Sequence, residues 1–147
     1  MSALNAGITP AGEGEGGIVW SILGQTYKPV ASCDSTFAFE AFAPPGTFVP
    51  PHIHTTQDEF IRVLEGELDL ILDGQSHKAR AGDLVRMPMG LMHGFWSNGA
   101  APARALFWVS PARSLETLFQ RIHNVPDPAE VIRIAAEHEV EFLPIPG

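Results

Sequence analysis

Three histidines and one glutamate in the middle of the chain have residue types and spacings that suit a metal site. His52 and His54 are separated by one residue, Glu59 follows shortly after, and His93 stands further along. Neutral imidazoles and a carboxylate are suitable ligands for a divalent first-row metal ion. An ion held this way with open coordination positions can bind dioxygen and an enolate, or polarise a carbonyl. The first hypothesis is therefore a metal-dependent enzyme that acts on small organic molecules.

Extended backbone explains how these four side chains meet. Side chains two residues apart on a strand point to the same face, so His52 and His54 project together into a barrel interior. Glu59 begins the next apolar stretch, and the short loop 55–58 allows the two strands to pair. His93 stands near the start of a further strand, after a turn. The four residues therefore require a β-structure that closes around them.

Short apolar stretches separated by Gly, Pro or Asp predict such a structure. They are residues 17–23, 25–32, 36–43, 59–66, 67–74, 75–80, 83–88, 92–97 and 103–110. Within 67–74, leucines alternate with acidic residues, and Asp73-Gly74 predicts a hairpin turn. Many short antiparallel strands are typical of a sandwich or a jelly-roll barrel, here over residues 17–110.

The tail, residues 111–147, changes to helical spacing. A first helix is predicted behind a possible Ser114 cap, with Leu115, Leu118, Phe119 and Ile122 as its apolar side. A second begins with Asp127 as the cap, Pro128 in the first turn and Glu130 completing a capping box. The apolar stripe of this second helix is Val131, Ile132, Ile134 and Ala135. Both helices are expected to pack on the outside of the barrel.

Composition and charge exclude several classes of protein. With 147 residues, 45% apolar and 18% charged, the chain is expected to form one globular domain. Nine basic against seventeen acidic residues, a net charge of −8, argue against nucleic acid and anionic membrane surfaces as partners. No apolar run approaches the roughly 20 residues of a membrane span.

Residues 1–16, small, glycine-rich and acidic, lack the features of a signal peptide and are expected to form a loose lead-in. A single cysteine, Cys33, makes the cytoplasm the expected compartment.

The two stretches that contain the candidate ligands resemble the two motifs of the cupin superfamily. The first matches at every fixed position: Gly46, five residues, His52-x-His54, four residues, Glu59, six residues, Gly66. The second, Gly82, five residues, Pro88-x-Gly90, two residues, His93, departs only at its closing position, where Ser97 replaces an asparagine. The resemblance covers roughly residues 36–109. It implies a double-stranded β-helix, or jelly-roll barrel, in which His52, His54, Glu59 and His93 bind one divalent ion. The residues leave the ion open among Fe, Mn, Ni, Co, Cu and Zn.

Within the superfamily, residues 58–74 and 127–144 look most similar to single-domain bacterial proteins related to quercetin 2,3-dioxygenase. This resemblance implies dioxygen-dependent cleavage of an aromatic or enolic substrate. It also implies that Glu59 binds the substrate hydroxyl and takes its proton, as a catalytic base. That family usually has a glycine at the position of Glu139.

Two other classes of function remain open. A redox-neutral isomerase or lyase would use the same metal as a Lewis acid, and an inward-facing Tyr, Lys or Arg near the metal would favour it. A non-catalytic small-molecule-binding barrel would be favoured by a filled interior. Candidates for the pocket wall are Phe42, Met92, Phe95, Trp96, Phe107 and Trp108.

Several other polar residues carry weaker expectations. Tyr27 as a catalytic acid is a minority hypothesis, and Arg62 and Arg86 are expected to face solvent. The remaining histidines, His77, His123 and His138, have no partner at ligand spacing and are not expected to bind metal. The strands near the N-terminus have no obvious covering element, which predicts a homodimer formed by edge pairing.

Overall fold

A computed structural model describes residues 2–144, so Met1 of the predicted lead-in and residues 145–147 of the predicted tail lie outside the described residues. The strands are β1 (Trp20–Ile22), β2 (Gln25–Ser32), β3 (Phe37–Ala43), β4 (Phe48–His54), β5 (Asp58–Glu65), β6 (Glu67–Leu72), β7 (Gln75–Arg80), β8 (Leu84–Met87), β9 (His93–Trp96), β10 (Ala103–Ser110) and β11 (Val140–Phe142). The helices are α1 (Leu115–Ile122) and α2 (Pro128–Ala136), and η1 (Glu15–Gly17) is a short 3-10 turn.

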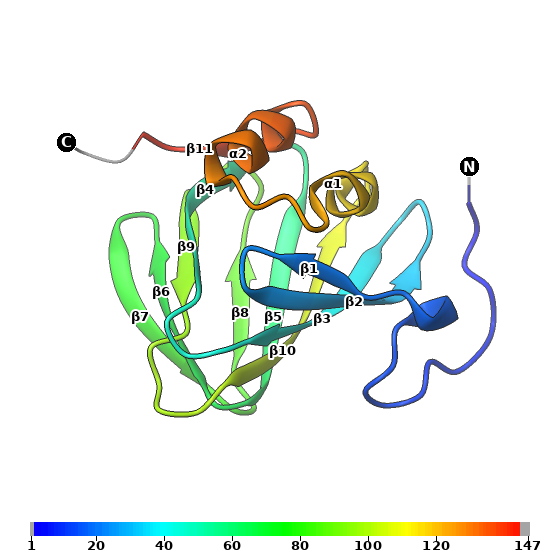
Figure 1. Cartoon of the computed structure of the whole chain (residues 1–147), viewed down its shortest axis with the longest axis horizontal. Coiled ribbons are helices and arrows are strands. Elements are labelled where there is room, and N and C mark those ends of the chain that lie inside the picture. Colours follow the sequence, from blue (N-terminus) through cyan, green and yellow to red (C-terminus); the bar gives the residue numbers. More distant parts are fainter. Residues whose placement is uncertain (1, 145–147) are drawn as a thin grey trace.

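Two antiparallel sheets face each other and enclose the core, which confirms the predicted jelly-roll fold (Figure 1). Within the described residues, one sheet has the order β1-β2-β3-β10-β5-β8 and the other β11-β4-β9-β6-β7. Burial alternates along β3 and β10, as strands with one face on the core require. Their inward aromatic rings stack, since Phe39 and Phe107 lie 5.1 Å apart between ring centroids.

Two turns show why the motif and hairpin residues stand where they do. Asp73 and Gly74 have φ values of 51° and 83°, as a two-residue hairpin turn between β6 and β7 requires. Gly66, between β5 and β6, has φ 73°, and a Cβ atom there would lie 2.7 Å from the carbonyl oxygen of Pro102. The closing glycine of the first motif is thus required by backbone conformation and by space.

Ser97 fits the position at which the second motif departs from its usual asparagine. Its side chain is fully buried, and its hydroxyl donates to the carbonyl oxygen of Ala43 at 2.9 Å. Its backbone also bonds to Gly46 and Thr47. Ser97 therefore links the end of β9 to the turn that leads into β4.

The two predicted helices are present outside the sheets, at one end of the barrel (Figure 1). Asp127 caps α2 as predicted, because its carboxylate accepts from the Ala129 amide at 3.0 Å. Three details differ from the prediction. The Ser114 side chain does not cap α1, since its hydroxyl lies 2.8 Å from His138 Nδ1. Glu130 binds Arg133 and does not complete a capping box, and Ile132 is 40% exposed.

The tail also contains a strand that the sequence did not predict. β11 pairs with β4, placing Val140 opposite His54 and Phe142 opposite His52. The run at 140–142 is too short for a clear alternating pattern. The predicted helical tail therefore also supplies one edge of the five-stranded sheet.

The segment before β1 has little regular structure but is tied to β2. Thr9 donates its hydroxyl to the carbonyl oxygen of Val30, and Lys28 donates to that of Gly12, both at 2.8 Å. At the edge of the sheet, the Ser21 amide donates to His123 Nδ1, and its carbonyl accepts from the Asn124 amide. The end of α1 therefore covers this edge of β1 at Ser21, and the homodimer stays a prediction.

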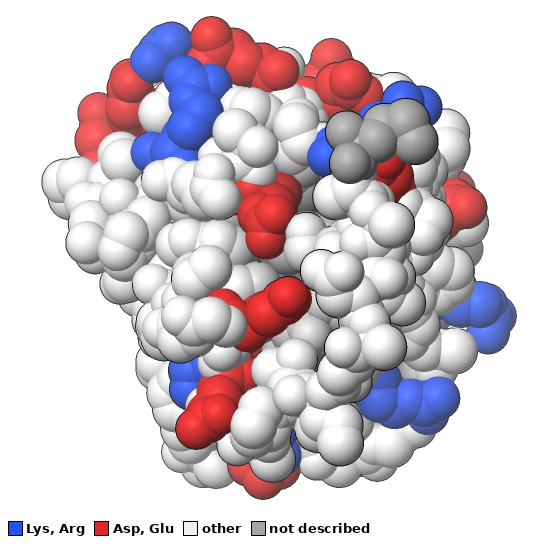
Figure 2. All heavy atoms as spheres, turned by 90° about the vertical axis from the view of Figure 1, so that its right-hand side faces the viewer, with Lys and Arg blue, Asp and Glu red and all other residues white. Residues whose placement is uncertain are grey.

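The surface and the helices give two further observations. On the face shown in Figure 2, Lys and Arg side chains occur in separate groups among acidic ones, and most of the surface is uncharged. Among the described residues, no helix has both the length and the apolar character needed to cross a membrane.

Candidate metal centre

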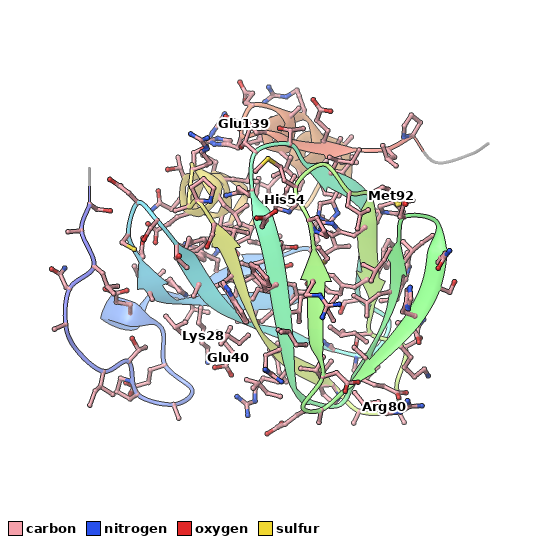
Figure 3. All side chains as sticks on the ribbon, turned by 180° about the vertical axis from the view of Figure 1, so that it is seen from behind. Lys28, Glu40, His54, Arg80, Met92 and Glu139 are labelled. Carbon is pink, nitrogen blue, oxygen red and sulfur yellow. The ribbon has the colours of Figure 1, made fainter. Side chains whose placement is uncertain are left out.

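The structure brings the four predicted ligands together between the sheets. His52 and His54 lie on β4, Glu59 near the start of β5, and His93 at the start of β9. All four are buried, and one ligand atom from each lies within 4.8 Å of the others. His52 stands directly opposite His93 in the β4–β9 pair, with ring centroids 4.4 Å apart. The cluster lies toward the helix-covered end of the barrel, where Figure 3 shows His54 below Glu139 and far from Arg80.

The glutamate lies between two of the imidazoles. Glu59 Oε1 is 3.1 Å from His93 Nε2, and Glu59 Oε2 is 3.5 Å from His54 Nε2. Its neighbours along β5, Ile61 and Val63, point to the same side and are fully buried. Strand alternation thus fixes the carboxylate on the inner face.

Each of the three imidazoles is oriented by a partner of its Nδ1 atom. His52 Nδ1 lies 2.9 Å from the carbonyl oxygen of Pro50, and His93 Nδ1 lies 3.2 Å from that of Leu91. A carbonyl oxygen only accepts, so both Nδ1 atoms carry hydrogen. His54 Nδ1 lies 2.8 Å from Gln57 Oε1, which is likewise an acceptor. In the neutral form of each ring the Nε2 atom then carries the lone pair, and these atoms face Glu59 and the centre of the cluster.

Burial and mutual charge favour the protonation states that bind metal. Burial, and then the positive charges that His93 and His54 would carry, lower the pKa of His52 to about 3. Burial alone would raise the pKa of Glu59, but His54, and then His93 and His52, outweigh it and lower that pKa to about 2. A neutral imidazole and a carboxylate are the ligand forms of these groups.

These observations test whether the residues fit a metal ion. With the rings neutral, three nitrogen lone pairs and a carboxylate converge on one centre, an arrangement that a cation stabilises. Second partners on Nδ1 of each histidine are usual for imidazoles that bind metals. The donor set is one that divalent first-row ions accept. The cluster therefore fits one divalent ion, and which ion binds stays a prediction.

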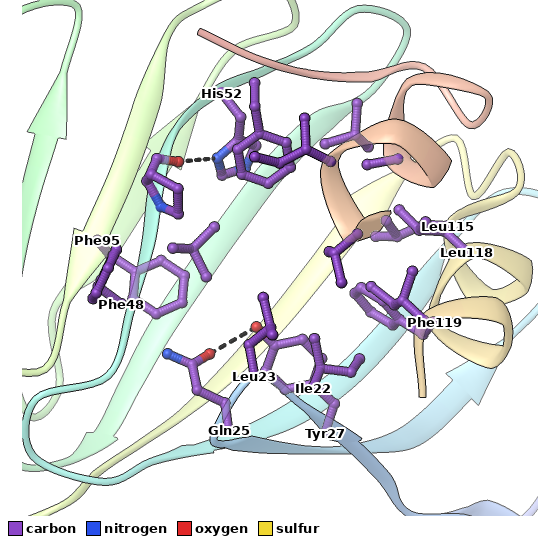
Figure 4. Close-up of a pocket in the computed structure, with 18 of the residues that line it drawn as sticks. Ile22, Leu23, Gln25, Tyr27, Phe48, His52, Phe95, Leu115, Leu118 and Phe119 are labelled. Carbon is purple, nitrogen blue, oxygen red and sulfur yellow. Dashed lines mark hydrogen bonds between the residues drawn. The ribbon is translucent and has the colours of Figure 1, made fainter. Parts of the chain in front are cut away.

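A cavity of about 520 Å³ extends from this cluster, within the size range of small-molecule sites. His52, His54 and Glu59 contribute to its lining, and of the described residues around it none is Lys or Arg. The two helices supply a large part of its apolar wall: Leu115, Leu118, Phe119, Ile122, Val131 and Ala135 (Figure 4). The helices therefore both cover the barrel and line its cavity.

The predicted wall residues are only partly correct. Phe95 and Phe107 line the cavity, whereas Met92 and Trp96 do not. Strand alternation turns two of the candidate aromatic residues away from the core. Trp108 stacks on Phe60 with ring centroids 5.2 Å apart, and Phe42 is 43% exposed.

The other predicted polar residues lie outside the cluster. Arg62 and Arg86 are exposed, as expected. His77 is exposed on β7, while His123 and His138 bond to Ser21 and Ser114. Cys33 is buried and lies beside Ser35.

Two glutamines near the cavity did not stand out in the sequence. Gln57 lies in the loop between β4 and β5, where a polar residue is ordinarily solvated, so only its position three residues after His54 hints at its contact. Gln25 lines the cavity together with Tyr27. Their spacing of two in a predicted strand places both on one face, so alternation could have paired them.

Comparison with known proteins agrees with this geometry. Residues 39–109 match the Cupin_2 family, described as a cupin domain. Protein SchB of Streptomyces halstedii is 30% identical over 102 residues, which are 69% of this chain and 72% of SchB. The chain belongs to the cupin superfamily. This cupin is also 35% identical over 77 residues to the polyketide synthase CurC of Streptomyces cyaneus, and the match spans 52% of the cupin but only half of CurC.

Two further comparisons bear on fold and function. An RmlC-like cupin structure from Shewanella frigidimarina NCIMB 400 superposes with a TM-score of 0.67 at 20% identity, covering 77% of this cupin and 97% of that chain. That likeness shows the fold. The quercetin 2,3-dioxygenase of Bacillus subtilis is 38% identical over 50 residues, which are 34% of this cupin and 15% of the enzyme. The predicted superfamily and fold are thus confirmed.

Proposed function

We propose that this cupin is a metal-dependent dioxygenase that cleaves an apolar aromatic or enolic small molecule. One observation carries the proposal: four buried ligand residues, His52, His54, Glu59 and His93, stand at one side of an apolar cavity of about 520 Å³. The short match to quercetin 2,3-dioxygenase supports the reaction class.

The chain's own residues would perform three tasks. A divalent ion, when bound, supplies Lewis acidity and, for a redox-active metal, one-electron chemistry toward dioxygen. His52, His54 and His93 hold their Nε2 lone pairs toward the centre because their Nδ1 atoms are already bonded. The apolar wall excludes water and favours an aromatic substrate over a sugar-like one. Glu59 lines the cavity beside the histidines, so its carboxylate would accept the proton of an enolic hydroxyl bound there.

A second candidate is a redox-neutral reaction, such as an isomerisation or cyclisation, on a polyketide-like substrate. Two relatives carry names that point this way: the polyketide synthase CurC, and the tetracenomycin polyketide synthase protein TcmJ of Streptomyces glaucescens, which is 29% identical over 86 residues and matched over 58% of its length. Tyr27 lines the cavity but stands across it from His52, so the names of these relatives, and not a tyrosine beside the metal ligands, support this candidate. The same apolar cavity suits an aromatic polyketide. A binding barrel without turnover receives less support, since the interior is not filled by side chains.

The decisive experiment has two stages. The protein is purified without added metal, and its metal content is measured by mass spectrometry; we expect about one divalent ion per chain. A His52→Ala, His54→Ala variant should lose this ion, whereas His77→Ala, which changes an exposed histidine of β7, should retain it. Metal content that does not depend on His52 and His54 would refute the site.

Oxygen uptake is then measured with protein loaded with Fe, Mn, Ni, Co, Cu or Zn in turn. Flavonols and simple enols serve as substrates, and we expect uptake with at least one redox-active metal. If the protein holds metal but no combination of metal and substrate gives oxygen uptake, the dioxygenase proposal is refuted. Product formation from an aromatic polyketide under anaerobic conditions would then establish the second candidate.

A further inference from the structure

A buried polar group stands on the wall of the cavity across from His52. It consists of Gln25 and Tyr27 on β2 and Thr47 in the turn before β4, and all three line the cavity. Gln25 is 2% and Tyr27 6% exposed. Figure 4 shows the pair Gln25–Tyr27 at one side of the pocket and His52 at the other, with apolar side chains between them. The cavity thus has two polar ends.

The hydrogen bonds at this second end run in one direction. Thr47 donates its hydroxyl hydrogen to the carbonyl oxygen of Pro44 at 2.7 Å, so its oxygen can only accept from Gln25. Gln25 therefore presents its amide nitrogen to Thr47, at 3.3 Å. The Gln25 carbonyl oxygen is then left for Tyr27, whose hydroxyl donates to it at 2.7 Å. The orientation of the amide follows from this chain of donors and acceptors.

This direction leaves two hydrogen-bonding positions for a ligand. A glutamine amide has two N–H hydrogens, and within the described residues only one of them has an acceptor, Thr47. The Tyr27 oxygen has already used its hydrogen and retains a lone pair. Burial, and then the charge of Glu59, raise the pKa of the Tyr27 hydroxyl far above its ordinary value, so it remains protonated. Tyr27 therefore acts here as an acceptor and not as the catalytic acid considered from the sequence.

We propose that Gln25 and Tyr27 bind a hydroxyl group at the end of the substrate remote from the metal ligands. A hydroxyl matches both positions, because it accepts from the Gln25 amide and donates to the Tyr27 oxygen. A carbonyl would use only the amide and place its lone pairs against those of Tyr27. An anionic group would be buried without a partner, since of the described lining residues none is Lys or Arg. The inference rests on the proposed function, because the same cavity must hold the substrate.

The substrate class follows from both ends. It is an apolar ring system with an enolic oxygen at the metal end, as the proposed function requires, and a hydroxyl at the other end. Gln25 and Tyr27 are thus positioning residues, which set the orientation of the rings relative to Glu59. Sites built around a hydroxyl discriminate against analogues that lack it, because their polar groups are left unpaired.

The test compares two probes that differ only at the remote end. 3-Hydroxyflavone and 3,4′-dihydroxyflavone share the 3-hydroxy-4-keto pair, and the second adds a hydroxyl on the distal ring. Their affinities are measured by fluorescence titration on zinc-loaded and on metal-free protein. We expect wild-type protein to bind 3,4′-dihydroxyflavone about 3- to 10-fold more tightly, as one neutral hydrogen-bond site contributes.

Three variants identify the residues responsible. Tyr27→Phe removes the acceptor and Gln25→Met removes the donor, and both keep most of the side-chain volume. In each, the ratio of the two affinities should fall toward 1, while the affinity for 3-hydroxyflavone changes by less than about twofold. Phe95→Leu, on the apolar wall, is the matched control: both affinities should fall together and the ratio should stay as in wild type. Thermal unfolding verifies that each variant is folded.

The outcomes separate this inference from the proposed function. Equal affinities in wild type would mean that only water occupies this end, and would overturn the inference. A ratio that persists in both Tyr27→Phe and Gln25→Met, or binding of neither probe, would also overturn it. Since the ratio is measured with and without zinc, failure to hold metal or to consume oxygen leaves this test intact. Conversely, equal affinities for the two probes would leave the assignment of the metal site unchanged.

Discussion

Gln57 accepts a hydrogen bond from His54 Nδ1 at 2.8 Å and, with its amide nitrogen, donates to the carbonyl oxygen of Ala112 at 2.7 Å. A second carbonyl, that of Pro111, lies 3.2 Å from the same nitrogen. One buried side chain therefore connects a candidate ligand to the segment that leads from β10 into α1. The orientation of the His54 ring depends on how the tail docks.

Replacing Gln57 tests this connection. In Gln57→Leu, His54 loses the acceptor that fixes its ring, and metal affinity should fall about 10- to 100-fold, as for other second partners of metal-binding histidines. The loss of the hydrogen bonds from Gln57 to the carbonyls of Pro111 and Ala112 should lower the free energy of unfolding by about 1–3 kcal/mol. Competition with a chromophoric zinc chelator and urea unfolding measure the two effects. Gln75→Leu, at an exposed glutamine of β7, should change neither, and equal losses in the two variants would contradict the role of Gln57.

Metal binding should stabilise the folded chain. An ion that binds only the folded state at 100 times its dissociation constant adds about 2.7 kcal/mol to the free energy of unfolding. Thermal unfolding with and without added Zn²⁺ should therefore show a clear upward shift, which a chelator reverses. In Glu59→Gln the carboxylate charge is lost and the shift should shrink strongly, whereas Glu67→Gln, on β6, should keep it. An undiminished shift in Glu59→Gln would place the ion elsewhere.

Gly94 should be intolerant of even a methyl group. A Cβ atom at this position would lie 2.9 Å from both the Pro51 nitrogen and the Val49 oxygen, where β4 shifts register against β9. We expect Gly94→Ala to lower the free energy of unfolding by about 1–3 kcal/mol and to weaken metal binding, because it separates His52 from His93. Gly99→Ala is the control, since its Cβ would meet atoms no closer than 3.5 Å. Unfolding and zinc titration of both variants provide the measurement, and wild-type behaviour of Gly94→Ala would disprove the packing argument.

Glu139 stands where related proteins are expected to have glycine, and its φ of 65° shows the reason. A left-handed backbone costs a non-glycine residue roughly 1–2 kcal/mol. Its carboxylate accepts from Thr56, an exposed contact that offsets only part of this cost. Glu139→Gly should therefore raise the free energy of unfolding by about 0.5–1 kcal/mol. Thr56→Val, which removes only the hydrogen bond, should lower it slightly, and a decrease in both variants would show that the bond outweighs the strain.

The homodimer stays a prediction, and sedimentation equilibrium tests it. Because the end of α1 occupies the edge of β1 at Ser21, we expect the contact to involve the outer face of the six-stranded sheet, where Trp108 stacks on Phe60. Trp108→Glu should then shift the protein toward monomer. Met89→Glu, at an exposed residue of the β8–β9 loop, should not. A wild-type protein that sediments as a monomer would refute the predicted homodimer.

Local patterns predicted the strands and the ligands because both depend on short-range geometry. Alternation alone places His52 and His54 on one face, and turn residues such as Asp73-Gly74 mark the hairpin. The contacts of Gln57 and Gln25 depend on segments distant in sequence, and no local period reports them. The sequence did not predict β11 for the same reason, since these three residues form a strand only by pairing with the edge of β4.

The pairing of β11 with β4 has a consequence for biosynthesis. The strand that carries His52 and His54 obtains one of its two neighbours from residues 140–142, which follow all four candidate ligands in the sequence. During vectorial synthesis, this neighbour leaves the ribosome after all four ligands have emerged. One edge of β4 therefore stays unpaired by β11 until residue 142 has been translated. The strand that carries His52 and His54 is thus paired on both sides only after β11 has been synthesised.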